Sequence, residues 1–282
     1  MKNGTVWVVG ASSGLGLATA EAFAKDGWLV VSGARSFGAP ETENGAGGGI
    51  HRLGLDVTDA DSRKAFTQKA FALSPRVDVL IYCAAVLVLG PCETTSQAEY
   101  ERVMRTNFLG MTGMVSLAMP AMRSQHSGRI ILFSSINGLL GIPFQSAYTA
   151  SKHAVEGYAE CLAMEVKPYG VQVSVVEPGD HRGGSQRTRL HAAAEDGASP
   201  YEAAYRMGCG IIHRDEANGL PPDQLGRKVL KNAKRGRMRF RLRVAKPDQR
   251  LMVVLHDVLP PGLSFRILRD YYGKGGRANG NA

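Results

Sequence analysis

Near its start the chain reads Thr5-Val-Trp-Val-Val-Gly-Ala-Ser-Ser-Gly-Leu-Gly16, a run of β-forming residues that leads into a glycine-rich turn. Apolar and β-branched residues at 5–9 favour a short strand, and the pattern at 17–26 favours a helix. Glycines in such a turn let the backbone approach a pyrophosphate, which the helix N-terminus attracts. The stretch therefore predicts a dinucleotide-binding turn made by Gly10, Ser12, Ser13, Gly14, Leu15 and Gly16.

Strand-like and helical segments alternate along most of the chain. Strand patterns occupy residues 28–32, 77–83, 129–134 and 171–176, and helical patterns occupy residues 59–72, 96–122 and 148–167. This alternation predicts an α/β fold, a Rossmann-type doubly wound parallel sheet sandwiched by helices. We expect a single domain over residues 1–273, with a surface loop at 37–49, a variable substrate region at about 180–222, a C-terminal substrate-pocket extension at about 223–273 and a flexible tail at 274–282.

The composition indicates a globular protein with a basic surface. Of 282 residues, 44% are hydrophobic and 21% charged, and 34 Lys and Arg against 25 Asp and Glu give a net charge of +9. A basic excess can serve nucleic acid, an anionic membrane surface or an acidic ligand, but more often it has no specific partner. The longest apolar run, residues 77–89, is too short to cross a bilayer, so we expect no membrane span.

The cysteines favour a reducing compartment. No pair among the four has Cys-x-x-Cys spacing, and we find no cluster with metal-ligand spacing. Cys83 and Cys161 fall in apolar segments and are predicted to be buried thiols. We also recognise no secretory signal, so the sequence predicts a cytoplasmic protein with no metal.

The segment Ser146-Ala-Tyr-Thr-Ala-Ser-Lys-His-Ala-Val155 carries the chemistry. An unperturbed tyrosine titrates near about 10, so a phenol works near neutral pH only where a neighbour stabilises its anion. Residues four apart on a helix share one face, which places the ammonium of Lys152 beside the hydroxyl of Tyr148. Ser135 lies thirteen residues upstream of Tyr148. Together with the glycine-rich turn suited to a dinucleotide, these features indicate a nicotinamide-dependent oxidoreductase.

In combination these motifs resemble the short-chain dehydrogenase/reductase family, and especially its hydroxysteroid and retinol dehydrogenase-like members. The resemblance spans Thr5 to about Tyr272 and rests on the glycine turn, Leu55-Asp56-Val57-Thr58, Asn107, Ser135 with Gly138, Tyr148-x-x-x-Lys152 and Pro178-Gly179. Two departures are Tyr82-Cys83-Ala84-Ala85, where Asn-Asn-Ala-Gly is usual, and Gly183, where a threonine is common. His181 or Arg182 could reach toward substrate or cofactor instead.

The resemblance implies a role for each matching residue. Tyr148 would donate or accept the proton, Ser135 would bind the substrate oxygen, and Lys152 would bind the nicotinamide ribose as well as assist Tyr148. Asn107 would hold a water in a proton relay. The remaining cofactor contacts would come from Asp56 and Val57 at the adenine, from Cys83, Ala84 and Ala85, and from Pro178 and Gly179 under the nicotinamide.

The end of the second strand, Ser32-Gly-Ala-Arg-Ser36, bears on the cofactor. An acidic residue there would favour NAD(H), and none is present. Arg35, with Ser36 beside it, could pair with a 2′-phosphate, so we expect NADP(H) rather than NAD(H).

The long C-terminal region resembles the part of family members that walls a lipophilic pocket. Candidate lining residues are Met207, Ile211, Ile212, Phe265 and Leu268. We therefore expect interconversion of a ketone and a secondary alcohol on a bulky apolar substrate, with a hydroxysteroid or ketosteroid as the first candidate. The resemblance also implies a homodimer or homotetramer.

Three alternatives remain open. The chain could reduce a small carbonyl metabolite with NAD(H), or it could be a non-catalytic dinucleotide sensor. The third is a nucleic-acid or membrane-surface protein that uses the arginines at every odd position from 235 to 243. Their alternation indicates a strand with one arginine face, and a charged edge strand explains it more simply, so we expect no nucleic-acid partner.

Overall fold

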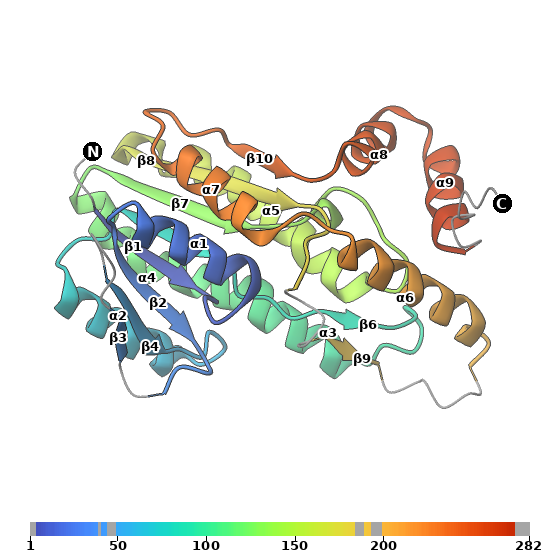
Figure 1. The fold of residues 1–282 in the computed structure, drawn as a ribbon, viewed down its shortest axis with the longest axis horizontal. Coiled ribbons are helices and arrows are strands. Elements are labelled where there is room, and N and C mark those ends of the chain that lie inside the picture. Colours follow the sequence, from blue (N-terminus) through green and yellow to red (C-terminus); the bar gives the residue numbers. More distant parts are fainter. Residues whose placement is uncertain (1–3, 39–40, 44–48, 184–188, 193–198, 274–282) are drawn as a thin grey trace.

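The structure, a computed structural model, describes residues 4–38, 41–43, 49–183, 189–192 and 199–273. A twisted sheet with helices on both faces forms the body of the molecule, which confirms the predicted fold class (Figure 1). The strands of the main sheet are β1 (Thr5–Val9), β2 (Leu29–Ala34), β3 (Glu41–Glu43), β4 (Ile50–Gly54), β5 (Val79–Tyr82), β7 (Gly128–Phe133), β8 (Val171–Pro178) and β10 (Arg241–Val244). A separate two-stranded sheet pairs β6 (Val88–Leu89) with β9 (Leu190–His191).

The order across the main sheet is β10-β8-β7-β5-β1-β2-β4-β3. All neighbours are parallel except β3, which pairs antiparallel with β4. From β1 the chain moves outward in one direction through β2 and β4, and then crosses back to β5 on the other side. In parallel sheets of this kind, ligands bind beyond the carboxyl ends of the strands at that reversal.

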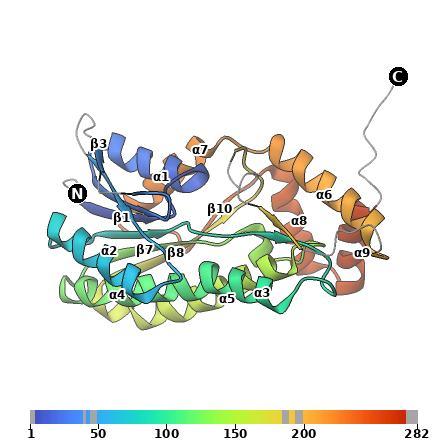
Figure 2. The same ribbon diagram turned by 90° about the horizontal axis from the view of Figure 1, so that it is seen from below.

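Helices cover both faces of the sheet (Figure 2). They are α1 (Gly14–Lys25), α2 (Ala60–Leu73), α3 (Gln97–Met104), α4 (Gly110–Ser124), α5 (Ser146–Glu165), α6 (Glu202–Ala217), α7 (Pro222–Ala233), α8 (Pro247–Val258) and α9 (Pro261–Gly273). One layer holds α1 and α7, and the other holds α2, α4 and α5, while α6, α8 and α9 gather at one end (Figures 1 and 2). No helix in the described part of the chain is both long and apolar enough to cross a bilayer.

The predicted helix at 96–122 is interrupted by a π-helical turn. A capping box between Ser96 and Glu99 starts α3, and the turn at Arg105–Leu109 then joins α3 to α4 without a break in direction. Such turns insert one extra residue into a helix and often occur at functional sites. Residue periodicity does not reveal a single inserted residue, so the sequence showed one long helix.

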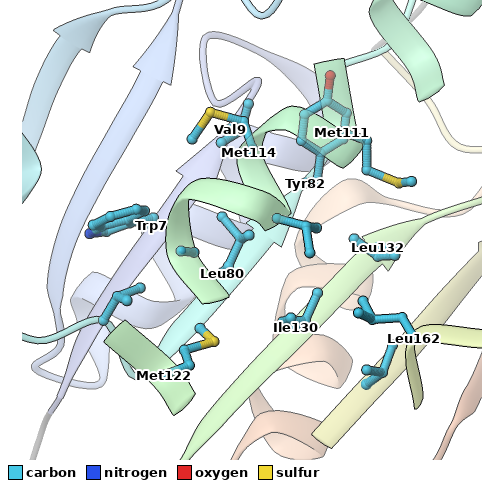
Figure 3. Packing of buried hydrophobic residues seen from close by; sticks show 14 of the residues in the cluster. Trp7, Val9, Leu80, Tyr82, Met111, Met114, Met122, Ile130, Leu132 and Leu162 are labelled. Atoms are coloured by element: carbon cyan, nitrogen blue, oxygen red, sulfur yellow. The ribbon is translucent and has the colours of Figure 1, made fainter. Parts of the chain in front are cut away.

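The larger core lies between the sheet and the layer of α2, α4 and α5 (Figure 3). Trp7 on the central strand β1 is fully buried, and Phe66 and Phe71 of α2 meet its ring edge-on at centroid distances of 5.9 and 4.9 Å. Met111, Met114 and Met122 of α4 are also fully buried. Burying one large apolar side chain stabilises the fold by about 1.5–3 kcal/mol. This packing holds β1 in place, and with it the glycine turn that follows.

Several sequence predictions need correction. Cys161 is exposed and Cys83 is only half-buried, whereas Cys209 is buried. The predicted loop at 37–49 contains β3. Only the last part of the arginine-rich segment forms a strand, β10, which is the edge strand of the sheet as expected. Its Arg241 and Arg243 pair with carboxylates of neighbouring elements.

Candidate active site

A cleft of about 450 Å³ opens at the carboxyl ends of the parallel strands. Its walls come from the turns after β1, β2, β5, β7 and β8 and from α5, with Ile212 of α6 and Tyr272 of α9 at the far end. All the site residues predicted from the sequence line this cleft except Asn107. Segments more than 160 residues apart therefore meet where the sheet topology places a ligand site.

The glycine turn after β1 is shaped so that side chains have no space. Gly10 has a φ of +85°, and a Cβ atom there would lie 2.5 Å from the backbone nitrogen of Ala84. A Cβ at Gly16 would overlap the carbonyl oxygen of Gly10. Ser13 caps α1 without a side-chain hydrogen bond, and the first turn of α1 has no acidic residue. The cradle and the positive end of the helix fit a pyrophosphate group.

Asp56 lies at the opening of the cleft beyond β4. Its Oδ1 accepts hydrogen bonds from the backbone nitrogen and the hydroxyl of Thr58, at 2.8 and 2.7 Å. Burial acts to raise the pKa of Asp56, but the Thr58 hydrogen bonds and the charges of Arg35 and Arg63 outweigh it and lower the pKa below its ordinary value. Asp56 thus shapes its own turn, and Arg35, exposed at the end of β2, lies within its electrostatic reach.

Tyr148 and Lys152 project from consecutive turns of α5. Lys152 Nζ lies 5.4 Å from the centre of the Tyr148 ring and donates to the backbone oxygen of Phe133 at 2.7 Å. Burial lowers the pKa of Lys152 to about 8. Burial also raises the pKa of Tyr148 to about 12, against a smaller lowering by Ser135. The predicted proximity is present, but burial prevents the expected fall in the Tyr148 pKa.

Ser135 follows β7 and starts a short 3₁₀ turn, Ile136–Gly138. Its hydroxyl donates to Asn137 Oδ1 and accepts from the Asn137 backbone nitrogen, each at 3.2 Å. The side chain of Asn137 in turn donates to Gln145 Oε1 at 3.0 Å. This chain of hydrogen bonds fixes the Ser135 hydroxyl in the same cleft as Tyr148.

Asn107 lies one layer behind the cleft, in the π-helical turn. Its Oδ1 accepts from the backbone nitrogen of Val86 at 2.8 Å, and its Nδ2 donates to the oxygen of Val86 and to Ser151 Oγ, at 3.0 and 2.9 Å. The side chain therefore holds the Val86 backbone, which lines the cleft, and links it to α5.

The far end of the cleft includes residues that the sequence did not reveal. Leu87, Ile142 and Tyr272 provide apolar surface there, and Asp180, Asp215 and Glu216 provide carboxylates. Of the lining residues predicted from the C-terminal region, only Ile212 reaches this cleft. Met207 and Phe265 are exposed, and Ile211 and Leu268 are buried elsewhere. Helix period alone shows which residues lie on one face, but not which face meets the cleft.

On the loop where Gly183 replaces the common threonine, both His181 and Arg182 line the cleft, and Arg182 is exposed. His181 is buried, lines the cleft, and binds the oxygen of Gly179 through Nδ1 at 2.8 Å. A carbonyl oxygen can only accept, so Nδ1 carries the proton. Burial, together with the charge of Lys228, lowers the pKa of His181, although the Gly179 hydrogen bond opposes this.

Comparison with known proteins places this geometry in a family. The family model described as short chain dehydrogenase matches residues 4–192. A 3-ketodihydrosphingosine reductase of Bacteroides thetaiotaomicron is 34% identical over 267 residues, which cover 95% of this chain and 97% of that protein. Human retinol dehydrogenase 8 is 36% identical over 180 residues, 62% of this chain and 58% of that protein.

A solved structure agrees over the whole length. The crystal structure of a short-chain dehydrogenase from Streptomyces avermitilis superimposes with a TM-score of 0.79 and 26% identity, and the match covers 100% of both chains. The chain belongs to the short-chain dehydrogenase family and is an NAD(P)-dependent oxidoreductase.

Proposed function

We propose that this protein reduces a ketone to a secondary alcohol with NADPH, on a long-chain or otherwise bulky apolar substrate that carries an amino group. The main support for this reaction is that Ser135, Tyr148 and Lys152 line the same cleft as the glycine turn. When bound in this cleft, the dinucleotide would supply the hydride for the carbonyl carbon. Side chains of the protein itself would then transfer the proton.

Tyr148 suits the role of proton donor. With a pKa of about 12 it keeps its proton at neutral pH, and an alkoxide formed from a ketone is a far stronger base than a phenolate. Ser135 provides a hydroxyl that can bind the substrate oxygen while negative charge develops there. Lys152, next to the Tyr148 ring, stabilises the phenolate that remains after proton transfer.

The cofactor preference rests on Arg35 and Ser36. Both line the cleft directly after β2, where NAD(H) enzymes of this fold commonly have an acidic residue. A guanidinium group can bind a phosphate through two parallel hydrogen bonds. The glycine turn and the free amino end of α1 would hold the pyrophosphate, and Asp56, Val57, Ala84, Pro178 and Gly179 would line the remaining length of the nucleotide.

The far end of the cleft supports the proposed substrate class. Arg189 pairs with Glu216 and Arg214 pairs with Asp215, whereas the donor to Asp180 Oδ2 is the neutral amide of Gln249, at 2.5 Å. Burial, with Asp215 and Glu216 nearby, raises the pKa of Asp180 to about 7, although the charge of Lys246 opposes this. A protonated amine bound here next to apolar walls would favour the ionised form of Asp180. The Bacteroides relative is named for a ketone on a long-chain amine, which agrees with this combination.

A substrate panel tests the proposal. We would follow NADPH and NADH oxidation with 3-ketodihydrosphingosine, with a ketone of the same chain length but no amine, and with ketosteroids. We expect NADPH-dependent turnover that is fastest with the amino ketone, and Asp180→Asn should reduce that advantage. If the protein turned over only the ketosteroids, the proposed amino group on the substrate would be refuted. The roles of Ser135, Tyr148 and Lys152 would still stand. Nucleotide binding without turnover of any member would favour a dinucleotide sensor.

A further inference from the structure

A network of charged side chains, of which Glu156 and Glu177 are buried, lies behind Lys152. Glu156 follows Lys152 by one turn of α5 and is 6% exposed. Arg241 of β10 donates through Nη1 to Glu156 Oε2 at 2.6 Å and to Glu177 Oε1 at 2.8 Å. Neither Glu156 nor Arg241 lines the cleft. The charges therefore come from behind the site and not from the ligand side.

The network continues along the edge strand. Arg241 and Arg243 share one face of β10, since residues two apart on a strand point the same way. Arg243 Nε donates to Glu177 Oε2 at 2.7 Å, and Glu177 is fully buried. Arg241 Nη2 donates outward to Glu160 Oε1 at 2.7 Å. Three carboxylates thus face two guanidinium groups, and the ammonium of Lys152 is the third positive charge.

Glu156 is the anion that faces Lys152. Burial lowers the pKa of Lys152, and Cys83 and Glu156 are the neighbours that oppose this. Desolvation raises the pKa of the half-buried Cys83 thiol above its ordinary value, so Cys83 is neutral near pH 7. The Tyr148 hydroxyl is also neutral there. Of these neighbours, Glu156 is therefore the one that supplies negative charge to Lys152 near pH 7.

Glu156 depends in turn on Arg241. Burial raises the pKa of Glu156, and the nearby Glu177 raises it further, while Ser134 and Arg241 act against both. Without the guanidinium group, two buried carboxylates would share one site and one of them would take up a proton.

We propose that Glu156, kept ionised by Arg241, holds Lys152 in its protonated form, so that Glu156 and Arg241 are positioning residues for the Tyr148–Lys152 pair. The inference rests on the proposed function for its consequence in catalysis. Its physical content, the charge of Lys152, can be measured without turnover.

The experiment is a ¹³C NMR titration of the lysine Cε resonances, with Lys152 assigned by its loss in Lys152→Met. The titration midpoint of Lys152 should move about 1 pH unit lower in Glu156→Gln and in Arg241→Gln. Arg243→Gln is the matched control, because it also removes a guanidinium group from Glu177 but does not touch Glu156. Its Lys152 midpoint should stay at the wild-type value.

A second readout connects the network to catalysis. With a substrate found in the panel, the alkaline limb of the kcat profile should move to lower pH in Glu156→Gln and Arg241→Gln, and Arg241→Lys should restore part of it. An unchanged Lys152 midpoint in Glu156→Gln would overturn the inference, whether or not the protein turns over a ketone. An equal fall in Arg243→Gln would also overturn it, since the effect would then come from loosened structure.

Discussion

The ammonium of Lys152 and the ring of Tyr148 lie 5.4 Å apart on one face of α5, and the Phe133 carbonyl holds the ammonium in place. This geometry follows from a spacing of four residues on a helix that is buried against the sheet. It places a cation beside a phenol whose pKa burial raises to about 12, so that the phenol keeps its proton near pH 7.

Tyr148→Phe should abolish reduction while leaving nucleotide binding intact. The substitution removes only the hydroxyl, and general acid catalysis contributes about 10²–10⁴-fold. Turnover of the best ketone should fall at least about 100-fold, and NADPH affinity, measured by fluorescence titration, should stay near wild type. Wild-type turnover in this variant would show that another group donates the proton.

Arg35→Leu should reverse the cofactor preference. The side chain is exposed at the end of β2, so its loss should leave folding unchanged. Loss of a charge-assisted phosphate contact should lower kcat/KM with NADPH about 10–100-fold and change the value with NADH little. If both values fall equally, Arg35 contacts a part common to the two cofactors.

Gly16→Ala should damage the nucleotide cradle. The new methyl group would overlap the oxygen of Gly10, and backbone atoms cannot move aside as a flexible side chain can. We expect NADPH binding to weaken at least about tenfold, with a loss of stability of about 1–3 kcal/mol. Gly141→Ala is the control, because a Cβ there meets no atom within 4 Å and φ is not positive. Equal effects in the two variants would show that the turn has no special role.

Asp180→Asn should make stability less dependent on pH. Burial, with Asp215 and Glu216 nearby, raises the pKa of Asp180 to about 7. Between about pH 4 and pH 7 the folded protein therefore holds a proton that the unfolded chain has released, so this group favours unfolding as pH rises. At about pH 8 the variant should be more stable by about 1–2 kcal/mol in urea titrations. Asp257→Asn, at an exposed carboxyl of α8, should change stability by less than about 0.5 kcal/mol, and a similar gain there would contradict the assignment.

Arg243→Gln should destabilise the fold through Glu177. The carboxylate is fully buried and would lose one of its two cations. Removing one partner of a buried ion pair costs about 3 kcal/mol, whereas an exposed pair contributes less than about 1 kcal/mol. Lys64→Ala, at an exposed pair with Asp61, is the comparison. If the free energy of unfolding fell by similar amounts in Arg243→Gln and Lys64→Ala, the buried pair would be no stronger than the exposed one and the prediction would be wrong.

The sequence predicted the sheet, the order of its elements and the position of the cleft. These follow from apolar strands and from residues such as Gly10, Tyr148 and Lys152, whose spacing is local. The observed strand ends differ from the predicted ones by a few residues. The strand predicted at 171–176, for example, is β8, which extends to Pro178. Ends of elements depend on hydrogen bonds to neighbouring strands, and the sequence does not show them.

The far end of the cleft could not be predicted. Asp180, Asp215 and Tyr272 meet there only because α6 and α9 fold over the ends of the strands. The arginine alternation at 235–243 was visible, but its partners Glu156 and Glu177 lie at least 64 residues away. A pattern in one segment does not identify a partner so distant in the chain.

The position of β10 determines which portion of the chain can fold independently. The segment that matches the family model ends at residue 192, while the strand that neutralises Glu177 begins at Arg241. A fragment that ended at 192 would expose β8 as an open edge and leave a buried carboxylate without its cations. We therefore expect the most recognisable two thirds of this protein not to form an autonomous folding unit, so that proteolysis or gene truncation before residue 241 would yield an aggregating product.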